Sequence, residues 1–174
     1  LVAAADELNT DDFADILQQL PKTISEQVLA SLDSRDRARV EAVLSFPEDS
    51  AGGLMDTDTI TVRPRHTLVL VLRYLRLRKE LPPGTDTLIV VNSEDQYLGM
   101  LPLAKVLTSD PSVTVREIMD SDVPAMHVDQ PDTEIARMFS DRDLISAAVV
   151  DDRGHLLGRI TIDDVVDVII EDAE

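Results

Sequence analysis

Carboxylates are the side chains of this sequence most able to do chemistry, and they are concentrated in its last third. The 174 residues contain 34 Asp and Glu against 16 Lys and Arg, a formal net charge of −18. Residues 120–174 hold fifteen of the acidic side chains and four of the basic ones. With no Cys, this ligand set suits hard, oxygen-preferring ions such as Mg²⁺, Ca²⁺ or Mn²⁺ better than zinc or copper.

The predicted helix at the end of the chain has the most regular acidic spacing. Asp163, Asp167 and Glu171 recur every four residues, and Asp164 and Glu174 extend the same side. Like charges at these spacings destabilise an isolated helix by about 0.2–0.5 kcal/mol per pair, so we expect a compensating group. That group is either a basic neighbour or a hydrated divalent cation. Periodicity alone favours a solvated acidic face over a cation site.

Three further acidic clusters widen the choice of cation ligands. They lie at a junction near residue 48, at the start of one predicted helix and just after its end. Their members are Glu48, Asp49, Asp129, Asp132, Glu134, Asp141 and Asp143. The three His residues, His66, His127 and His155, are separated along the chain, and we interpret each as a surface residue and not a ligand.

Several function classes are disfavoured. A strongly acidic surface repels nucleic acid and anionic lipid, so we expect no nucleic-acid partner. The sequence has no Asp-x-Asp-x-Asp-Gly loop, which excludes an EF-hand. It has no Gly-x-x-x-x-Gly-Lys loop, no plausible Ser-His-Asp set and no cofactor fingerprint, so we predict a protein that is not an enzyme. No apolar run approaches the roughly 20 residues that a membrane span requires, so we expect no direct membrane insertion.

An internal repeat organises the chain. Residues 87–107 align without a gap with residues 146–166, at an offset of 59 positions, which places Gly99 on Gly158. Upstream, Met55 corresponds to Met119 at an offset of 64, so the first copy carries five extra residues, which we place within residues 81–86. Each copy is predicted to run strand, helix, strand, strand, helix.

The predicted elements follow from hydrophobic spacing. Three short helices are expected over residues 1–45, and a Pro- and Gly-containing junction follows at 46–53. The first repeat has a strand at 60–62 and a helix whose core face holds Leu68, Val71, Leu72 and Leu75. The second has a strand at 125–128, a helix opened by residues 131–133 with Ile135, Met138 and Phe139 on its core face, and strands at 147–150 and 156–162. We expect the chain to be a piece of a longer protein, because it lacks an initiator Met and ends within a helix.

This tandem order resembles a pair of cystathionine-β-synthase (CBS) motifs over about residues 50–172. The resemblance implies two similar units packed sheet against sheet. The fold class is therefore expected to be mixed, α+β or α/β, with a short α-helical N-terminal segment followed by the tandem pair.

Two stretches carry a closer resemblance. Residues 46–55, FPEDSAGGLM, are similar to the signature that joins the helical domain to the CBS pair in the MgtE family of magnesium transporters, and residues 162–173 are similar to the end of that family's second CBS motif. The resemblance implies a helical N-domain fragment at 1–49, which looks shortened, CBS motif 1 at 50–110, and CBS motif 2 with the start of a connecting helix at 111–174.

The same resemblance implies a function. It indicates a cytosolic Mg²⁺ sensor in which ions bound between acidic faces favour a compact state that closes a pore, whereas low Mg²⁺ lets the domains separate. The implied partners are a second copy, through the CBS pair, and a transmembrane pore domain of the same full-length chain at the cytoplasmic side of a bacterial membrane. The implied metal ligands are Glu48, Asp49, Asp143, Asp164, Asp167 and Glu171, with Asp129, Asp132 and Glu134 as further candidates.

Adenine nucleotide is the alternative ligand. CBS motifs that bind ATP or AMP often contain Gly-x-x-Thr-x-x-Asp, and the second repeat has Gly158, Thr161 and Asp164 in this spacing. The first repeat departs from it, with Pro102 and Lys105 in the Thr and Asp positions. This alternative predicts a nucleotide-sensing CBS module that regulates an enzyme.

Overall fold

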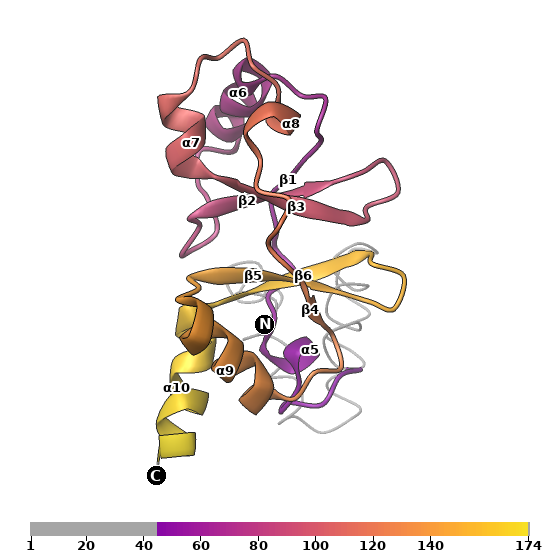
Figure 1. Cartoon of the computed structure of the whole chain (residues 1–174), viewed down its shortest axis with the longest axis vertical. Coiled ribbons are helices and arrows are strands. Elements are labelled where there is room, and N and C mark those ends of the chain that lie inside the picture. The colour runs from indigo at the N-terminus through magenta and orange to yellow at the C-terminus, as the bar shows by residue number, and fades with distance from the viewer. Residues whose placement is uncertain (1–44, 174) are drawn as a thin grey trace, which may run out of the picture.

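Two three-stranded sheets, facing each other across the middle of the molecule, form the framework of the fold (Figure 1). A computed structural model describes residues 45–173, with side-chain environments through residue 171. The helices expected over residues 1–45 lie outside these residues. Among the helices that are described, none is long and apolar enough to cross a bilayer.

The first sheet belongs to the first repeat. Its strands are β1 (Thr61–Val62), β2 (Thr87–Val91) and β3 (Tyr97–Pro102), with β1 parallel and β3 antiparallel to the central β2. Helix α6 (Leu68–Arg78) connects β1 to β2, and the short helices α7 (Leu103–Thr108) and α8 (Val115–Ile118) follow β3. Leu68 and Val71 of α6 are buried, as the spacing predicted, and the Thr67 hydroxyl caps the helix by accepting from the Leu70 amide.

The second sheet repeats this pattern. It consists of β4 (Met126–His127), β5 (Ser146–Val150) and β6 (Leu156–Thr161), with α9 (Asp132–Arg142) before β5 and α10 (Ile162–Ala173) after β6. The pair Val149–Gly158 occupies the same register as Val90–Gly99 in the first sheet. The predicted repeat and its strand, helix, strand, strand, helix order are thus confirmed.

The segments that lead into the two repeats are exchanged, which the sequence pattern did not predict. Helix α5 (Ala51–Leu54) precedes β1 in sequence but packs on α9 and β6 of the second unit. Asp56 then exchanges two backbone hydrogen bonds of 2.8 Å with Arg159 of β6. In the matching position, Asp120 exchanges 2.8 and 2.9 Å bonds with Met100 of β3. Each unit is therefore completed by a segment of the other repeat.

The exchange requires glycine in both sheets. A Cβ atom on Gly158 would lie 2.6 Å from the Asp56 carbonyl oxygen, and one on Gly99 would lie 2.4 Å from that of Asp120. These approaches explain why glycine stands at the same place in both copies of the repeat.

Three apolar clusters form the core of the described part of the chain. One lies within each unit, and a smaller one between the sheets contains Ile89, Val91, Met100 and Ala148. Tyr97 borders this smaller cluster and donates from its hydroxyl to the Val123 carbonyl at 2.6 Å, and burial raises the pKa of Tyr97 to about 12. The expected packing of sheet against sheet is confirmed.

Candidate functional site

Helix α10 presents the predicted row of carboxylates to solvent. Asp163, Asp167 and Glu171 are exposed, whereas Val165 and Val168 are buried on the opposite side, where α10 packs on α9. No Lys or Arg among residues 45–173 forms an ion pair with these three carboxylates. The compensating basic neighbour that the sequence left open is therefore absent from the described part of the protein.

Asp164 differs from the rest of the acidic row. It is half-buried, and its Oδ2 accepts hydrogen bonds from the amide and the hydroxyl of Thr161 at 2.9 and 3.1 Å. Burial raises the pKa of Asp164, while these bonds and the charge of Arg159 act in the opposite direction. Because Asp164 stands three residues after Thr161, its carboxylate helps to cap the start of α10.

A second acidic group surrounds the start of α9. The Asp132 amide donates to the Asp49 carbonyl at 2.8 Å, which brings the junction of residues 48–49 beside this helix. Asp129 and Glu134 lie on the same segment, and Glu134 accepts from the Gln130 side chain at 2.8 Å. Glu48, Asp49, Asp129 and Glu134 are exposed, and Asp132 is half-buried. Five of the nine predicted ligands thus share one neighbourhood.

Asp143 lies at the other end of α9, close to α10. It adopts a left-handed conformation with φ 52°, ends the helix and has an exposed side chain. The Ile162 amide donates to the Ile145 carbonyl at 2.8 Å, so residues 143–145 run beside the first turn of α10. Asp143 therefore lies near the start of α10 in the fold.

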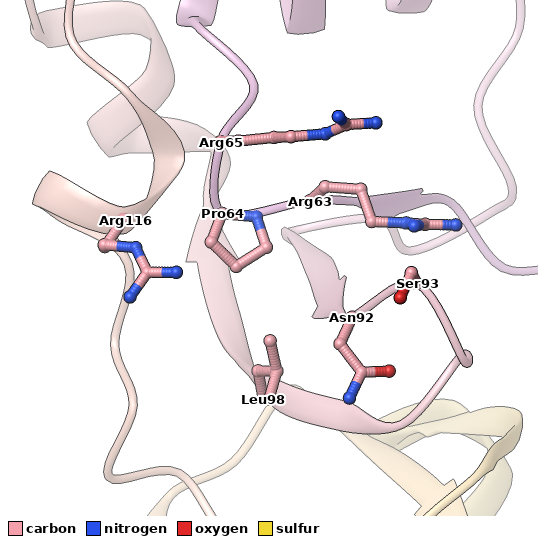
Figure 2. A pocket seen from close by; sticks show the side chains of 7 residues that line it. All are labelled: Arg63, Pro64, Arg65, Asn92, Ser93, Leu98 and Arg116. Carbon is pink, nitrogen blue, oxygen red and sulfur yellow. The ribbon is translucent and has the colours of Figure 1, made fainter.

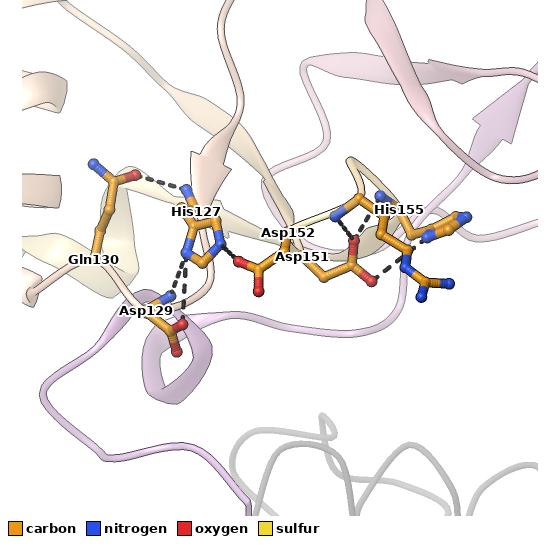
Figure 3. A network of polar contacts seen from close by, with 7 residues as sticks. His127, Asp129, Gln130, Asp151, Asp152 and His155 are labelled. Atoms are coloured by element: carbon orange, nitrogen blue, oxygen red, sulfur yellow. Dashed lines mark hydrogen bonds and ion pairs between the residues drawn. The ribbon is translucent and has the colours of Figure 1, made fainter.

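Only one group of three potential ligands comes close together within the described residues. His127, Asp129 and Asp152 each offer an atom within 4.8 Å of the others. His127 Nε2 lies 2.5 Å from Asp152 Oδ1, and its Nδ1 accepts from the Asp129 amide at 3.1 Å (Figure 3). A cation bound at Nε2 would replace this hydrogen bond to Asp152.

The contact between His127 and Asp152 was not predicted from the sequence. The two residues are 25 positions apart, and only the pairing of β4 with β5 brings them together. His155 contacts the neighbouring Asp151, with Nδ1 3.6 Å from Oδ2, so two of the three separated His reach the same turn (Figure 3). All three His side chains are half-buried.

The nucleotide motif of the second repeat is engaged in contacts within the chain. The connection from α6 to β2, residues 79–86, has eight residues, whereas the matching connection from α9 to β5, residues 143–145, has three. The first connection therefore contains the predicted five extra residues. This connection lies over β6, because Arg159 donates to the carbonyls of Pro83 and Gly84 at 2.5 and 3.4 Å. A Cβ on Gly84 would lie 3.6 Å from the Thr161 methyl group. Thr161 is buried beneath this loop.

In the first repeat, the positively charged Lys105 stands at the position that Asp164 occupies in the second repeat. Lys105 Nζ lies 2.6 Å from Asp120 Oδ1 and donates to the Ile118 carbonyl at 3.2 Å. An ammonium group is a hydrogen-bond donor only, so Lys105 does not supply the acceptor that a ribose hydroxyl requires.

Comparison with known proteins agrees with this architecture. A family model of the MgtE intracellular N domain matches residues 1–49, and a CBS domain model matches residues 115–171. The magnesium transporter MgtE of Thermus thermophilus is 37% identical over 169 residues, which cover 94% of this chain and 37% of that protein. A crystal structure of the cytosolic domain of the Mg²⁺ channel MgtE in complex with ATP is 37% identical, with a TM-score of 0.88 over 94% of this chain and 67% of that one.

The chain belongs to the MgtE family. It corresponds to the cytosolic region of MgtE, and it spans just over a third of the length of the Thermus thermophilus transporter. The crystal structure of the soluble part of another magnesium transporter has a TM-score of 0.90 at 26% identity, over 97% of this chain and 66% of that one. The predicted family and fold class are confirmed, and these three relatives are named as a transporter or a channel and not as enzymes. The nine predicted metal ligands and the domain boundaries stay predictions.

Proposed function

We propose that this chain is the Mg²⁺-sensing regulatory region of a magnesium transporter. Mg²⁺ bound between acidic faces favours a compact state that closes the pore, and low Mg²⁺ lets the domains separate. The region lies on the cytoplasmic side of a bacterial membrane, joined to the pore domain of the same full-length protein.

The observation that carries the proposal is the exposed acidic row of α10, which has no basic partner among residues 45–173. Asp163, Asp167 and Glu171 repel one another at helical spacing, and no described cation offsets this repulsion. A divalent ion held through carboxylates and its own water shell would offset it. Water-mediated binding also suits carboxylates that are near one another without lying within direct chelating distance.

The same argument applies to the acidic residues at the two ends of α9. Facing carboxylates repel when no ion is present, and bridging ions remove that repulsion, so the ion favours the state in which the faces meet. Several weak sites acting together give a steeper response to Mg²⁺ than one site, because their differential affinities multiply. The second acidic face would come from the helical N domain or from another copy.

The experiment is thermal unfolding of the chain with and without Mg²⁺. We expect 10 mM Mg²⁺ to raise the melting temperature, because an ion that binds only the folded state stabilises it by mass action. The double variant Asp167→Asn/Glu171→Gln is expected to lose most of this rise. Glu80→Gln/Glu94→Gln removes the same charge from exposed sites of the first unit and should keep it. An equal rise in both double variants would contradict the role of α10.

A homodimer through the CBS pair is part of the proposal. Exposed apolar side chains lie on the helices of both units, with exposed fractions of 75% for Leu77 of α6, 74% for Leu107 of α7 and 54% for Ile170 of α10. A second copy would cover such residues. Sedimentation velocity of the chain and of Leu77→Ser/Leu107→Ser tests this, with dimer expected only for the unmodified chain.

Adenine nucleotide sensing is the alternative function, favoured by the MgtE relative that was crystallised with ATP. It predicts that ATP or AMP raises the melting temperature without Mg²⁺, and that Thr161→Val abolishes the rise. The loop over Thr161 and the ammonium group of Lys105 argue against it. Stabilisation by nucleotide and none by Mg²⁺ would establish the alternative and reject the Mg²⁺ sensor.

A further inference from the structure

Arg159 of β6 is a buried basic side chain without an ion pair. It is 7% exposed, and no carboxylate among residues 45–173 forms a salt bridge with it. The hydrogen bonds that its guanidinium donates within these residues go to the carbonyls of Pro83 and Gly84, and its buried Nε has no partner among them. Because a charged donor binds an anion more strongly than a neutral carbonyl, this guanidinium is suited to an anionic partner.

The arginines around the cavity of the first unit are arranged differently. Arg63, Arg65 and Arg116 line a cavity of about 340 Å³, but Figure 2 shows the Arg63 and Arg65 side chains extending away from Arg116. Arg65 and Arg116 are exposed, so water hydrates their charges. Among the residues whose burial is described, Arg159 is the only buried basic side chain.

Two groups of the nucleotide motif lie close to Arg159. Thr161 is 8% exposed and stands two residues further along β6, so its side chain lies on the same face of the strand as that of Arg159. The half-buried Asp164 accepts hydrogen bonds from Thr161 through Oδ2. A guanidinium, a hydroxyl and a carboxylate together suit a ligand that carries both a phosphate and hydroxyl groups, as a nucleoside monophosphate does.

The loop of residues 79–86 separates these groups from solvent. Pro83 and Gly84 are exposed, while their carbonyls accept from the buried Arg159 at 2.5 and 3.4 Å. Gly84 has a φ of 72°, and a Cβ atom there would lie 3.6 Å from the Thr161 methyl group. The loop therefore supplies acceptors to Arg159 from the first repeat and covers the motif of the second.

The two repeats differ at both the motif and the loop. The second repeat keeps the Thr and Asp of the motif, and the eight-residue loop of the first repeat lies over them. The first repeat has Pro102 and Lys105 in these positions, which are half-buried, and the matching connection of residues 143–145 has only three residues. The longer loop thus covers the one motif that has retained its acceptor groups.

Few side chains hold this loop on the second unit. Leu81, Pro83 and Gly84 are exposed, and the side-chain hydrogen bond that the loop accepts from β5 is the one from Ser146 to Asp86, at 2.8 Å. Segments with few buried side chains open at a free-energy cost well below that of global unfolding. The loop can therefore open while the two sheets stay folded.

We propose that the loop of residues 79–86 is autoinhibitory and closes a nucleoside monophosphate site formed by Arg159, Thr161 and Asp164. In the closed state, the carbonyls of the loop take the place of the phosphate on Arg159. The ligand binds only when the loop lifts, so its apparent affinity is reduced by the small fraction of molecules that are open. This regulation is separate from Mg²⁺ sensing, and its failure would leave the Mg²⁺ proposal standing.

The test is calorimetric titration of the 174-residue chain with AMP, at fixed ionic strength and without divalent cations. Deleting residues 81–85 leaves a three-residue connection like that of residues 143–145 and removes both carbonyls from Arg159. We expect this deletion to raise the affinity for AMP about tenfold or more, because the open state no longer has to be populated at a cost. Thr161→Val in the shortened chain should abolish the gain.

A point variant and a second probe complete the test. Asp86→Ala, which loosens the loop without shortening it, should raise the affinity for AMP by a smaller factor, whereas Glu94→Ala removes an exposed carboxylate elsewhere and should not change it. Adenosine lacks the phosphate and should gain less than AMP from the deletion, because it offers Arg159 no anion.

Three results would overturn the proposal. They are equal AMP affinity in the shortened and unmodified chains, including no binding by either, a gain that survives Thr161→Val, and equal gains for adenosine and AMP. Circular dichroism establishes that each variant is folded. If the shortened chain unfolds, the comparison of Asp86→Ala with Glu94→Ala decides, and equal affinities in these two variants would reject the autoinhibitory role.

Discussion

Arg159 makes several of the buried polar contacts of the second unit. It is 7% exposed, its guanidinium donates to the carbonyls of Pro83 and Gly84, and its backbone pairs with Asp56. Its charge also lowers the pKa values of Asp56 and Asp164, although burial raises both overall. Its Nε has no partner within the described residues, so the site is not fully satisfied by hydrogen bonds.

The raised pKa of Asp56 predicts a pH dependence of stability. Because burial raises this pKa above its ordinary value of 3.8, the folded state binds a proton more readily than the unfolded state. The resulting contribution to stability is present below the unfolded-state pKa and is lost as pH rises through the folded-state pKa. We expect the unfolding free energy of the chain, relative to that of Asp56→Asn, to increase as pH falls from 7 to about 4. Urea unfolding at several pH values measures this, and parallel pH profiles would contradict it.

The close approach at Gly158 predicts a steric cost. Gly158→Ala places a methyl group 2.6 Å from the Asp56 carbonyl, so backbone must shift. We expect a loss of roughly 1–3 kcal/mol in unfolding free energy, as for other overpacked sites. Gly154→Asn is the control for backbone strain without overpacking, because nothing lies within 4 Å of its Cβ position. Its φ of 80° strains any side chain, but Asn adopts a positive φ more readily than most residues, so we expect a smaller loss. Equal, small losses in both variants would show that the exchanged segments do not pack as described.

At the scale of elements, the connection of residues 79–86 distinguishes the first repeat from the second. Its Asp86 accepts from the Ser146 hydroxyl at 2.8 Å, and its Pro83 and Gly84 carbonyls accept from Arg159. The loop therefore belongs to the first repeat in sequence and to the second unit in its contacts. It covers Thr161, the residue that a nucleotide would need to reach.

Removing the contact at Asp86 should release this loop. We expect Asp86→Ala to accelerate tryptic cleavage after Arg78 and Lys79, because the loop loses its side-chain hydrogen bond to β5. Glu94→Ala, which removes an exposed carboxylate outside this loop and away from both cleavage sites, is the control and should leave the rate unchanged. Limited proteolysis followed by mass spectrometry measures both rates, and identical rates would contradict a role for the Asp86 contact.

The elements themselves were largely predictable, because their signals are local. Hydrophobic spacing identified α6 through Leu68 and Val71 and α9 through Ile135 and Phe139, and the repeat identified both hairpins. The exchange of α5 was not predictable, since it depends on hydrogen bonds between Asp56 and Arg159, which are distant in sequence. The charge pattern placed Asp164 on the exposed acidic side of α10. Its half-buried position and its hydrogen bonds to Thr161 were missed, because a charge pattern does not reveal helix capping.

The type of ligand at the candidate site was predictable from the sequence, but the individual contacts were not. The residue types and helical spacing indicated an oxygen-ligand site, and the structure gathers five of the predicted carboxylates at one end of α9. The contact of His127 with Asp152 depends on the pairing of β4 with β5, so composition and spacing carried no signal for it.

At the scale of the whole molecule, the two units differ in charge although they share a fold. The first unit carries the basic side of α6, whereas the second carries the acidic row of α10 and the carboxylates around α9. Under the proposed function, the acidic second unit is the part that responds to Mg²⁺. The domains would then approach one another only when ions reduce the repulsion between their acidic faces.

The hydrodynamic radius of the 174-residue chain, measured as Mg²⁺ is titrated from zero to 10 mM at constant ionic strength, tests this account most directly. Bridging ions should make the radius fall steeply, and Asp167→Asn/Glu171→Gln should flatten the transition while Glu80→Gln/Glu94→Gln preserves it. A radius that stays constant across the titration in the unmodified chain would contradict a Mg²⁺-operated closure.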